Sequence, residues 1–119
     1  MTLLLIEQPA FTTHPKNPEI FREGGSITFS SDANGIPEPT FSWTKDGSEL
    51  TADDRISLSA DNKQLSLTNV NRTDSGEYRC VAANSVGTVN SNAATLTVYG
   101  KKTFTLFLLT SNYCVILGC

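Results

Sequence analysis

Between about residue 10 and residue 99 the sequence alternates apolar and polar residues in short runs, each closed by a turn signal. Successive side chains of a β-strand point to opposite faces of the sheet, so this alternation is typical of strands with one buried face. No stretch shows a sustained helical period. Seven or more short strands with closely spaced turns favour an all-β sandwich over a parallel sheet.

The strand pattern is clearest in six runs, namely residues 26–34, 40–45, 55–59, 64–70, 77–84 and 88–98. In each run the alternate residues make a face that suits burial. The residues that share these faces are Ile27, Phe29, Ser31, Phe41, Trp43, Ile56, Leu58, Leu65, Leu67, Tyr78, Cys80, Ala82, Ala94, Leu96 and Val98. We expect them to form the core between two sheets.

Turn residues separate the runs. Residues 24–25, 45–48, 61–62 and 85–87 contain the Gly, Asp and Asn residues that tolerate the positive φ of tight turns. Residues 34–39 contain two prolines, and a proline has no amide hydrogen to donate to a sheet. We therefore predict a loop over the whole of residues 34–39.

The chain resembles immunoglobulin domains of the I-set type at Trp43, at residues 74–80 (DSGEYRC) and at residues 83–87 (ANSVG). The resemblance covers residues 10–99. It implies an immunoglobulin-like β-sandwich in which two antiparallel sheets pack together with Greek-key connections. Residues 1–9 are then an N-terminal lead-in, and residues 100–119 are an apolar tail that we do not expect to belong to the domain.

The same resemblance implies structural roles for five residues. Trp43 corresponds to the family's tryptophan in the middle of the sandwich, where it packs beside Cys80. Tyr78, two residues before Cys80, corresponds to the tyrosine that hydrogen-bonds back across a corner of the chain. Arg55 and Asp74 match a pair that commonly forms an ion pair in this family, and we expect that pair here.

The chain departs from the family pattern at Ser31. Alignment of residues 27–35 on the family's second strand puts Ser31 where the first cysteine of the disulfide belongs, so no disulfide is expected. The missing bridge would have stabilised the fold by about 4 kcal/mol, a large part of the roughly 5 to 15 kcal/mol that is typical of a domain. A buried Ser31 hydroxyl is expected to donate to a backbone carbonyl of its own or a neighbouring strand.

The remaining cysteines, Cys114 and Cys119, lie in the tail. We expect all three cysteines to be thiols, with Cys80 acting as a small buried hydrophobic residue and the tail pair exposed. The tail pair could also cross-link chains. The tail itself, from Gly100 onward, could pair with the sandwich or drive self-association, or it could be a stretch that belongs to no natural domain.

Charge and hydropathy narrow the class of partner. A net charge of −3 and a pI near 5.0 argue against nucleic acid and against an anionic membrane surface, since both bind clustered Lys and Arg. The only adjacent basic pair, Lys101 and Lys102, is interpreted as the edge of a linker. Residues 1–6 are too short for the core of a signal peptide, and residues 104–117 fall short of the ~20 residues of a membrane-spanning helix. We expect no membrane insertion.

We expect no catalysis, cofactor, metal ion or small-molecule substrate. His14 is the only histidine and is expected in a solvated loop. Cys80 faces an apolar interior, which raises the pKa of a thiol and makes it unreactive. No Cys and His spacing suits zinc, residues 53–54 and 61–62 lack the spacing of a calcium loop, and no helix follows the glycines at 24–25.

Two functions remain for such a module. The first is protein recognition in a cell-surface adhesion or extracellular-matrix protein, with a protein partner such as another immunoglobulin-domain protein, in homophilic or heterophilic contact. The triplet Asn71-Arg72-Thr73 is a glycosylation candidate that fits this extracellular location, or it is a chance triplet in a polar turn. The second is a cytoplasmic structural module like those of giant muscle and cytoskeletal proteins, which Ser31 favours because that compartment is reducing.

Overall fold

A computed structural model describes residues 3–18, 21–100, 105–108 and 114–117 of the 119-residue chain. A single turn of 3-10 helix, η1 (Arg72–Asp74), is the only helical element of these residues. The strands are β1 (Glu7–Thr13), β2 (Phe21–Arg22), β3 (Ile27–Ser30), β4 (Asp32–Ile36), β5 (Thr40–Lys45), β6 (Ser48–Glu49), β7 (Ile56–Leu58), β8 (Gln64–Leu67), β9 (Gly76–Ala83), β10 (Thr88–Asn90), β11 (Ala94–Leu96), β12 (Val98–Tyr99), β13 (Thr105–Leu108) and β14 (Cys114–Leu117).

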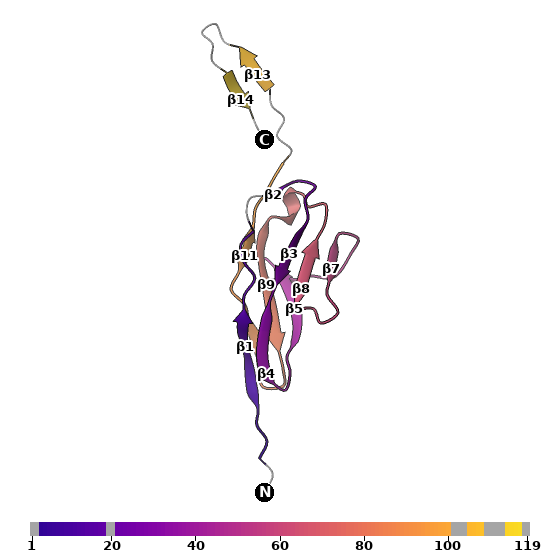
Figure 1. Cartoon of the computed structure of the whole chain (residues 1–119), viewed down its shortest axis with the longest axis vertical. Coiled ribbons are helices and arrows are strands. Elements are labelled where there is room, and N and C mark those ends of the chain that lie inside the picture. The colour runs from indigo at the N-terminus through magenta and orange to yellow at the C-terminus, as the bar shows by residue number, and fades with distance from the viewer. Residues whose placement is uncertain (1–2, 19–20, 101–104, 109–113, 118–119) are drawn as a thin grey trace.

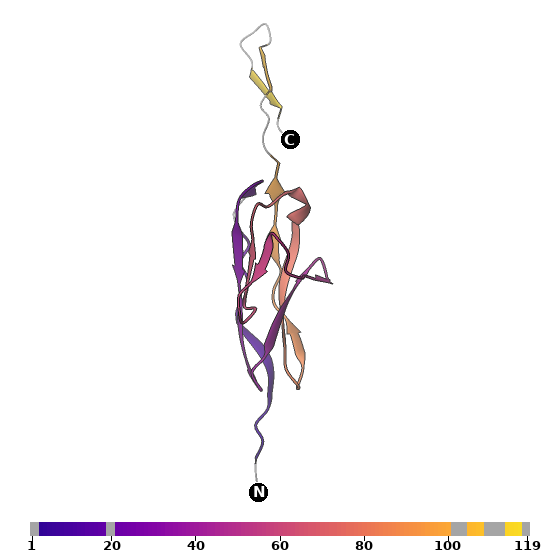
Figure 2. The same cartoon turned by 90° about the vertical axis from the view of Figure 1, so that its right-hand side faces the viewer.

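Two antiparallel sheets make the layers of a sandwich (Figure 1). One sheet has the order β3-β8-β7, and the other has the order β10-β9-β5-β6 with β11 also paired to β9. The antiparallel pair β1-β4 and the parallel pair β12-β2 complete the sandwich at its two ends. Figure 2 shows the layers on edge. The prediction of an all-β sandwich is confirmed.

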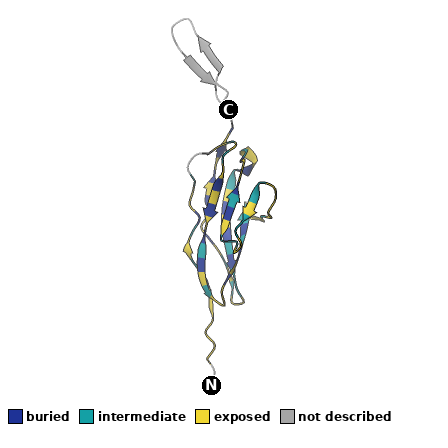
Figure 3. Ribbon diagram, turned by 45° about the vertical axis from the view of Figure 1, so that its right-hand side comes forward, coloured by how far each residue is buried: buried dark blue, intermediate teal, exposed yellow. Residues whose placement is uncertain are grey.

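The core lies between the sheets, where buried residues alternate with less buried ones along strands such as β3, β5 and β9 (Figure 3). The register of β5 and β9 pairs Trp43 with Cys80, so both side chains point into the same layer. Of the 15 residues expected to point inward, 13 are buried. Ile56 and Leu58 are half-buried, because β7 is the edge strand of its sheet.

The predicted loop over residues 34–39 is wrong for its first half. Strand β4 continues to Ile36, whose partner in β1 is Glu7, so only residues 37–39 lie outside the strands. The two prolines follow β4 instead of interrupting it. A strand with one neighbour, and with register shifts in its ladder, tolerates such a sequence better than a central strand would.

Two of the predicted strands are interrupted. The run 26–34 breaks at Ser31, where the chain leaves β8 as its partner and β4 begins to pair with β1. The run 88–98 breaks at residues 91–93, where the Ser91 hydroxyl accepts a hydrogen bond from the Cys80 amide at 2.9 Å. The alternation of the sequence continues through both breaks, so it could not reveal the change of partner.

The N-terminal lead-in contributes to the sandwich. Strand β1 begins at Glu7, three residues before the expected start of the domain, and Pro9 is fully buried. In the tail, β13 and β14 pair antiparallel with each other. Residues 101–104, 109–113 and 118–119, and therefore Lys101, Lys102 and Cys119, lie outside the described residues.

Candidate protein-binding surface

Exposed apolar side chains gather at the end of the sandwich where β1 begins. Seven large apolar side chains are exposed in the described part of the chain, and six of them belong to this end: residues 3–5, Ile6 (51% exposed), Ile36 (39%) and Val86 (40%). Ile36 pairs with Glu7, the residue that follows Ile6, at this end of the sandwich. We call this group of six residues the apolar pole. Most monomeric domains cover such a patch unless it contacts a partner.

Asn84 fixes the backbone around Ile36 and Val86 in the apolar pole. Its Nδ2 donates to the carbonyl oxygens of Glu7 (2.7 Å) and Pro37 (2.9 Å), and its Oδ1 accepts from the amides of Val86 (2.9 Å) and Gly87 (3.2 Å). One amide group therefore ties together β1, the loop after β4 and the β9-β10 hairpin. Contact surfaces held in place before binding lose less entropy when they bind.

Asn84 is a residue whose role sequence reasoning missed. The sequence identifies Asn84 only as a member of the family pattern at residues 83–87. An asparagine directly before a hairpin turn predicts the local bonds to Val86 and Gly87. The bonds to Glu7 and Pro37 join residues 77 and 47 positions away and need the three-dimensional arrangement.

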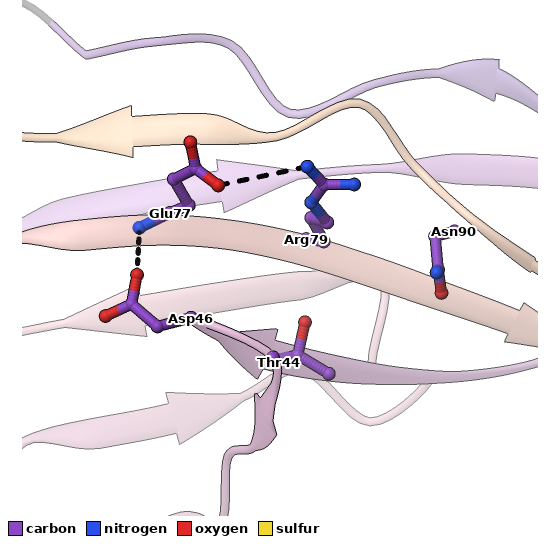
Figure 4. A pocket seen from close by; sticks show the side chains of 6 residues that line it. Thr44, Asp46, Glu77, Arg79 and Asn90 are labelled. Carbon is purple, nitrogen blue, oxygen red and sulfur yellow. Dashed lines mark hydrogen bonds and ion pairs between the residues drawn. The ribbon is translucent and has the colours of Figure 1, made fainter.

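A second surface feature is an open polar hollow of about 440 Å³ on the outer face of the β5-β9-β10 sheet (Figure 4). Its lining includes Thr44, Asp46, Glu77, Arg79 and Asn90. Glu77 and Arg79 form an ion pair at 3.8 Å whose side chains are 58% and 44% exposed, a kind that contributes little to stability.

Asp46 explains the glycine of the 74–80 motif. Its Oδ1 accepts a hydrogen bond from the Glu77 amide at 2.9 Å, which links the β5-β6 turn to β9 (Figure 4). A Cβ atom on Gly76 would lie 2.7 Å and 2.9 Å from the two carboxylate oxygens of Asp46. Only a glycine leaves room for this bond.

The interior between the sheets contains a group of three residues: Ser31, Trp43 and Cys80. We call this group the centre. Trp43 and Cys80 are completely buried, and Ser31 is 5% exposed. The Ser31 hydroxyl donates to the carbonyl of Lys63 at 3.1 Å. Cys80 is a free thiol, and burial raises its pKa, so it stays protonated and unreactive.

A polar network beside η1 consists of four residues: Arg55, Asn71, Asp74 and Tyr78. We call this network the corner. The Arg55 guanidinium donates to both oxygens of Asp74, at 2.7 and 3.0 Å. The Asp74 carboxylate also accepts from the Asn71 amide at 2.8 Å, and its backbone carbonyl accepts from the Tyr78 hydroxyl at 2.6 Å. Asn71 is the N-cap of η1.

Electrostatics in the corner follow from these contacts. Burial pushes the pKa of Asp74 upward, but hydrogen bonds from Arg55 and from the Asn71 amide outweigh it and hold the pKa below its ordinary value of 3.8. The hydrogen bond between Arg55 and Asp74 raises the pKa of Arg55. Burial, followed by the nearby Asp74 charge, raises the pKa of Tyr78 far above neutrality. The corner is therefore an ion pair at neutral pH, with a neutral phenol beside it.

His14 lies in the loop after β1. Its Nδ1 accepts a hydrogen bond from the Asn92 amide at 3.0 Å, and its ring lies 5.5 Å from the ring of Phe11. The residue links β1 to the segment between β10 and β11. Within the described ranges, no group of three His, Cys, Asp or Glu side chains is arranged to hold a metal ion. No helix in the same ranges is both long and apolar enough to span a membrane.

Comparison with known families gives one match. The model of the immunoglobulin I-set domain matches residues 9–98. Neural cell adhesion molecule 1 of Homo sapiens is 43% identical over 67 residues, which is 54% of this chain and 8% of the relative. The chain therefore spans less than a tenth of the length of that protein.

Solved structures with similar folds include tandem Ig repeats and a titin complex. The tandem Ig repeats of Dlar superpose with a TM-score of 0.72 and 31% identity, over 78% of this chain and 49% of that one. A chain from the complex of titin M10 with obscurin-like 1 Ig superposes with a TM-score of 0.73 and 31% identity, over 82% of this chain and 99% of that one.

Proposed function

The chain belongs to the immunoglobulin I-set family, and from this we propose that it is a non-catalytic protein-recognition module, one immunoglobulin domain of a cell-surface adhesion or extracellular-matrix protein. Similarity to neural cell adhesion molecule 1 supports the adhesion class. The partner in this proposal is a protein, for example another immunoglobulin-domain protein in homophilic or heterophilic contact. Nucleic acid, membrane insertion, small-molecule substrates and cofactors have no place in it.

The apolar pole is the observation that carries the proposal. Ile36 ends β4 and Val86 lies in the β9-β10 turn, yet Asn84 hydrogen-bonds both the Pro37 carbonyl next to Ile36 and the Val86 amide. The part of the pole formed by Ile36 and Val86 is thus built on bonded backbone, whereas residues 3–6 precede β1. A rigid apolar patch of this kind is suited to contact with another protein surface.

The path of the chain supports use in an array. Strand β1 enters at one end of the sandwich and β12 leaves at the other (Figure 1). Copies or relatives of the domain can therefore follow one another end to end, as in the tandem repeats of Dlar. Several weak contacts in one array together give strong binding, because each contact after the first is intramolecular.

We place the domain itself at residues 10–99, with 1–9 as a lead-in whose last residues, from Glu7, pair in β1, and with 100–119 outside it. Support comes from the family match and from the way β12 ends at Tyr99. Deletion of residues 101–119 should leave the melting temperature nearly unchanged in a thermal unfolding experiment. A drop of several degrees would show that the tail belongs to the folded unit.

We also propose that Ser31 occupies the position of the family's first cysteine. Its support is that Ser31 and Cys80 are both buried in the core between the sheets. A domain with Ser at this position forgoes the stability of the bridge.

A second candidate function is that of a cytoplasmic structural module, and two observations favour it. The free thiol of Cys80 needs no oxidising compartment, and titin domains are among the similar structures. Expression separates the two candidates. Folded, secreted protein from animal cells is the result expected for the extracellular module. Aggregation there, with soluble folding only in the cytosol, is expected for the structural module.

The test of protein recognition uses the chain displayed in many copies on beads. We expect the beads to bind at least one protein in a panel of displayed immunoglobulin-domain proteins that includes the chain itself. The double variant Ile36→Lys and Val86→Lys should abolish this binding, since two charges cannot be buried without partners.

The matched control adds the same charge elsewhere. Ser57→Lys with Thr95→Lys places two lysines at exposed positions of β7 and β11. This control should bind like the original chain. Binding that survives the change at the apolar pole, or no binding to any protein of the panel, would overturn the proposal.

A further inference from the structure

We infer that Asn71 carries an N-linked glycan when the chain passes through the secretory pathway, an inference that rests on the proposed extracellular function. Asn71-Arg72-Thr73 is the one Asn-x-Ser/Thr triplet of the sequence. Neither the binding proposal nor the core of the sandwich uses the amide nitrogen of this side chain.

The side chain of Asn71 is bonded on one side only. Its Oδ1 accepts from the Thr73 amide at 2.9 Å and from the Thr73 hydroxyl. Its backbone amide donates to Asp74 at 2.8 Å. The Nδ2 group takes part in none of the hydrogen bonds found among the described residues.

Glycosylation uses the atom that the fold leaves unbonded. In the transfer, Nδ2 of Asn71 attacks C1 of a sugar carried on a lipid-linked diphosphate. The N–C1 bond forms as the C1–O bond to phosphate breaks, Nδ2 loses one proton, and the lipid diphosphate leaves. The product is still an amide with a carbonyl oxygen, so the cap of η1 keeps both of its acceptor bonds.

Asn84 provides the contrast within the same molecule. Both hydrogens of its Nδ2 are used, toward Glu7 and Pro37, and a glycan there would break the apolar pole. Asn71 is half-buried, but Arg72 and Thr73 beside it are exposed, so the corner has an open side.

The location suits the proposed function. The helix η1 lies at the opposite end of the sandwich from the start of β1 (Figure 1). A glycan on Asn71 therefore covers the end where β12 leaves and stays clear of the apolar pole. The same module can be glycosylated and bind a partner.

The experiment translates the full chain behind a cleavable secretion signal into microsomes and then produces it in animal cells. Glycan is detected as a mass decrease after enzymatic removal, which converts the modified Asn to Asp. We compare Thr73→Ala with Thr73→Ser, because both keep the Asn71 cap but only Ser keeps the triplet. The original chain and Thr73→Ser should lose mass, and Thr73→Ala should not.

An internal control makes a negative result informative. The substitution Ile36→Thr creates a second triplet at Asn34, an exposed residue of β4. Glycan at Asn34 with none at Asn71 would overturn the inference while leaving the binding proposal in place. Removal of the Asn71 glycan from the native protein should leave its melting temperature almost unchanged. A large fall would contradict the argument that the fold does not use Nδ2.

Discussion

The centre and the corner both join the two sheets, but they do so with different chemistry. In the centre, Ser31 and Cys80 come from opposite sheets and are buried by apolar packing, and the Ser31 hydroxyl donates a neutral hydrogen bond to the Lys63 carbonyl. In the corner, Arg55 before β7 meets Asp74 before β9 through two charge-assisted bonds. The domain therefore keeps a strong polar link at its edge where the centre has no covalent one.

The consequences for stability differ as well. The corner depends on charge and therefore on pH. The centre contains no group that titrates near neutrality, since burial raises the pKa of the Cys80 thiol. The centre can be strengthened by oxidation if a second thiol is supplied, whereas the corner can only be weakened by removing a partner.

The largest expected effect is a gain at the centre. Ser31→Cys supplies a thiol beside Cys80, and under oxidising conditions the bridge should raise the free energy of unfolding by up to about 4 kcal/mol. Denaturant unfolding with and without a reducing agent measures the gain. Reduction should abolish it, as should a second substitution, Cys80→Ala. If the oxidised variant melts no higher than the original chain, Ser31 does not occupy the position of the family's first cysteine.

The next effect is a loss at the corner. Asp74→Ala leaves Arg55 and the Asn71 amide without their acceptor and should lower the free energy of unfolding by about 3 kcal/mol. We take the lower end of the range for broken buried pairs because the Arg55 side chain is 30% exposed. The matched control is Glu77→Ala, which breaks an exposed ion pair and should cost less than about 1 kcal/mol. Equal losses for both variants would mean that water screens the corner.

Much of this comparison could be predicted from the sequence. Alternation placed Trp43 and Cys80 on buried faces, because burial of one face imposes a period of two on any strand. The resemblance to the family supplied the pair Arg55 and Asp74, which the structure holds at 2.7 Å. Both inferences rest on patterns that are local or carried by a motif.

What the sequence could not predict depends on contacts between distant segments. The change of sheet partner at Ser31 leaves the alternation intact, so the run 26–34 looked continuous. The four bonds of Asn84 and the bond from Glu77 to Asp46 join loops whose distance is set only by the folded sandwich. The apolar pole was missed for the same reason, since its members lie far apart in the chain.

A smaller pair of effects compares single hydroxyl groups. Tyr78→Phe removes a buried hydroxyl and leaves the Asp74 carbonyl without that donor, so it should cost about 1 to 2 kcal/mol. Ser31→Ala removes the donor to the Lys63 carbonyl but also removes a polar group from the apolar centre, so it should cost about 1 kcal/mol or less. Denaturant unfolding of both variants checks the order. A larger loss from Ser31→Ala would make the centre the stronger polar link.

The smallest effect is the dependence of the corner on pH. The pKa of Asp74 is lower in the folded chain than the ordinary value of 3.8, so the carboxylate contributes stability that is fully present above pH 3.8. That contribution is lost as the pH falls below 3.8 and passes through the lowered pKa, because the folded state must then take up a proton against Arg55. Unfolding curves from neutral pH to below pH 3.8 should show the fall.

Comparison of two proteins isolates the part of the acid-induced loss of stability that is due to Asp74. Asp53 and Asp61 also have lowered pKa values, the first through backbone amides of Arg55 and Ile56 and the second through the Ser59 hydroxyl and the Lys63 amide. Asp53 and Asp61 keep these contacts in the variant Asp74→Asn, in which the side chain at position 74 cannot titrate. The original chain should therefore lose more stability in acid than Asp74→Asn does. If both proteins lost the same stability in acid, the acid sensitivity would come from the exposed carboxylates. The corner would then not differ from the centre in its dependence on pH.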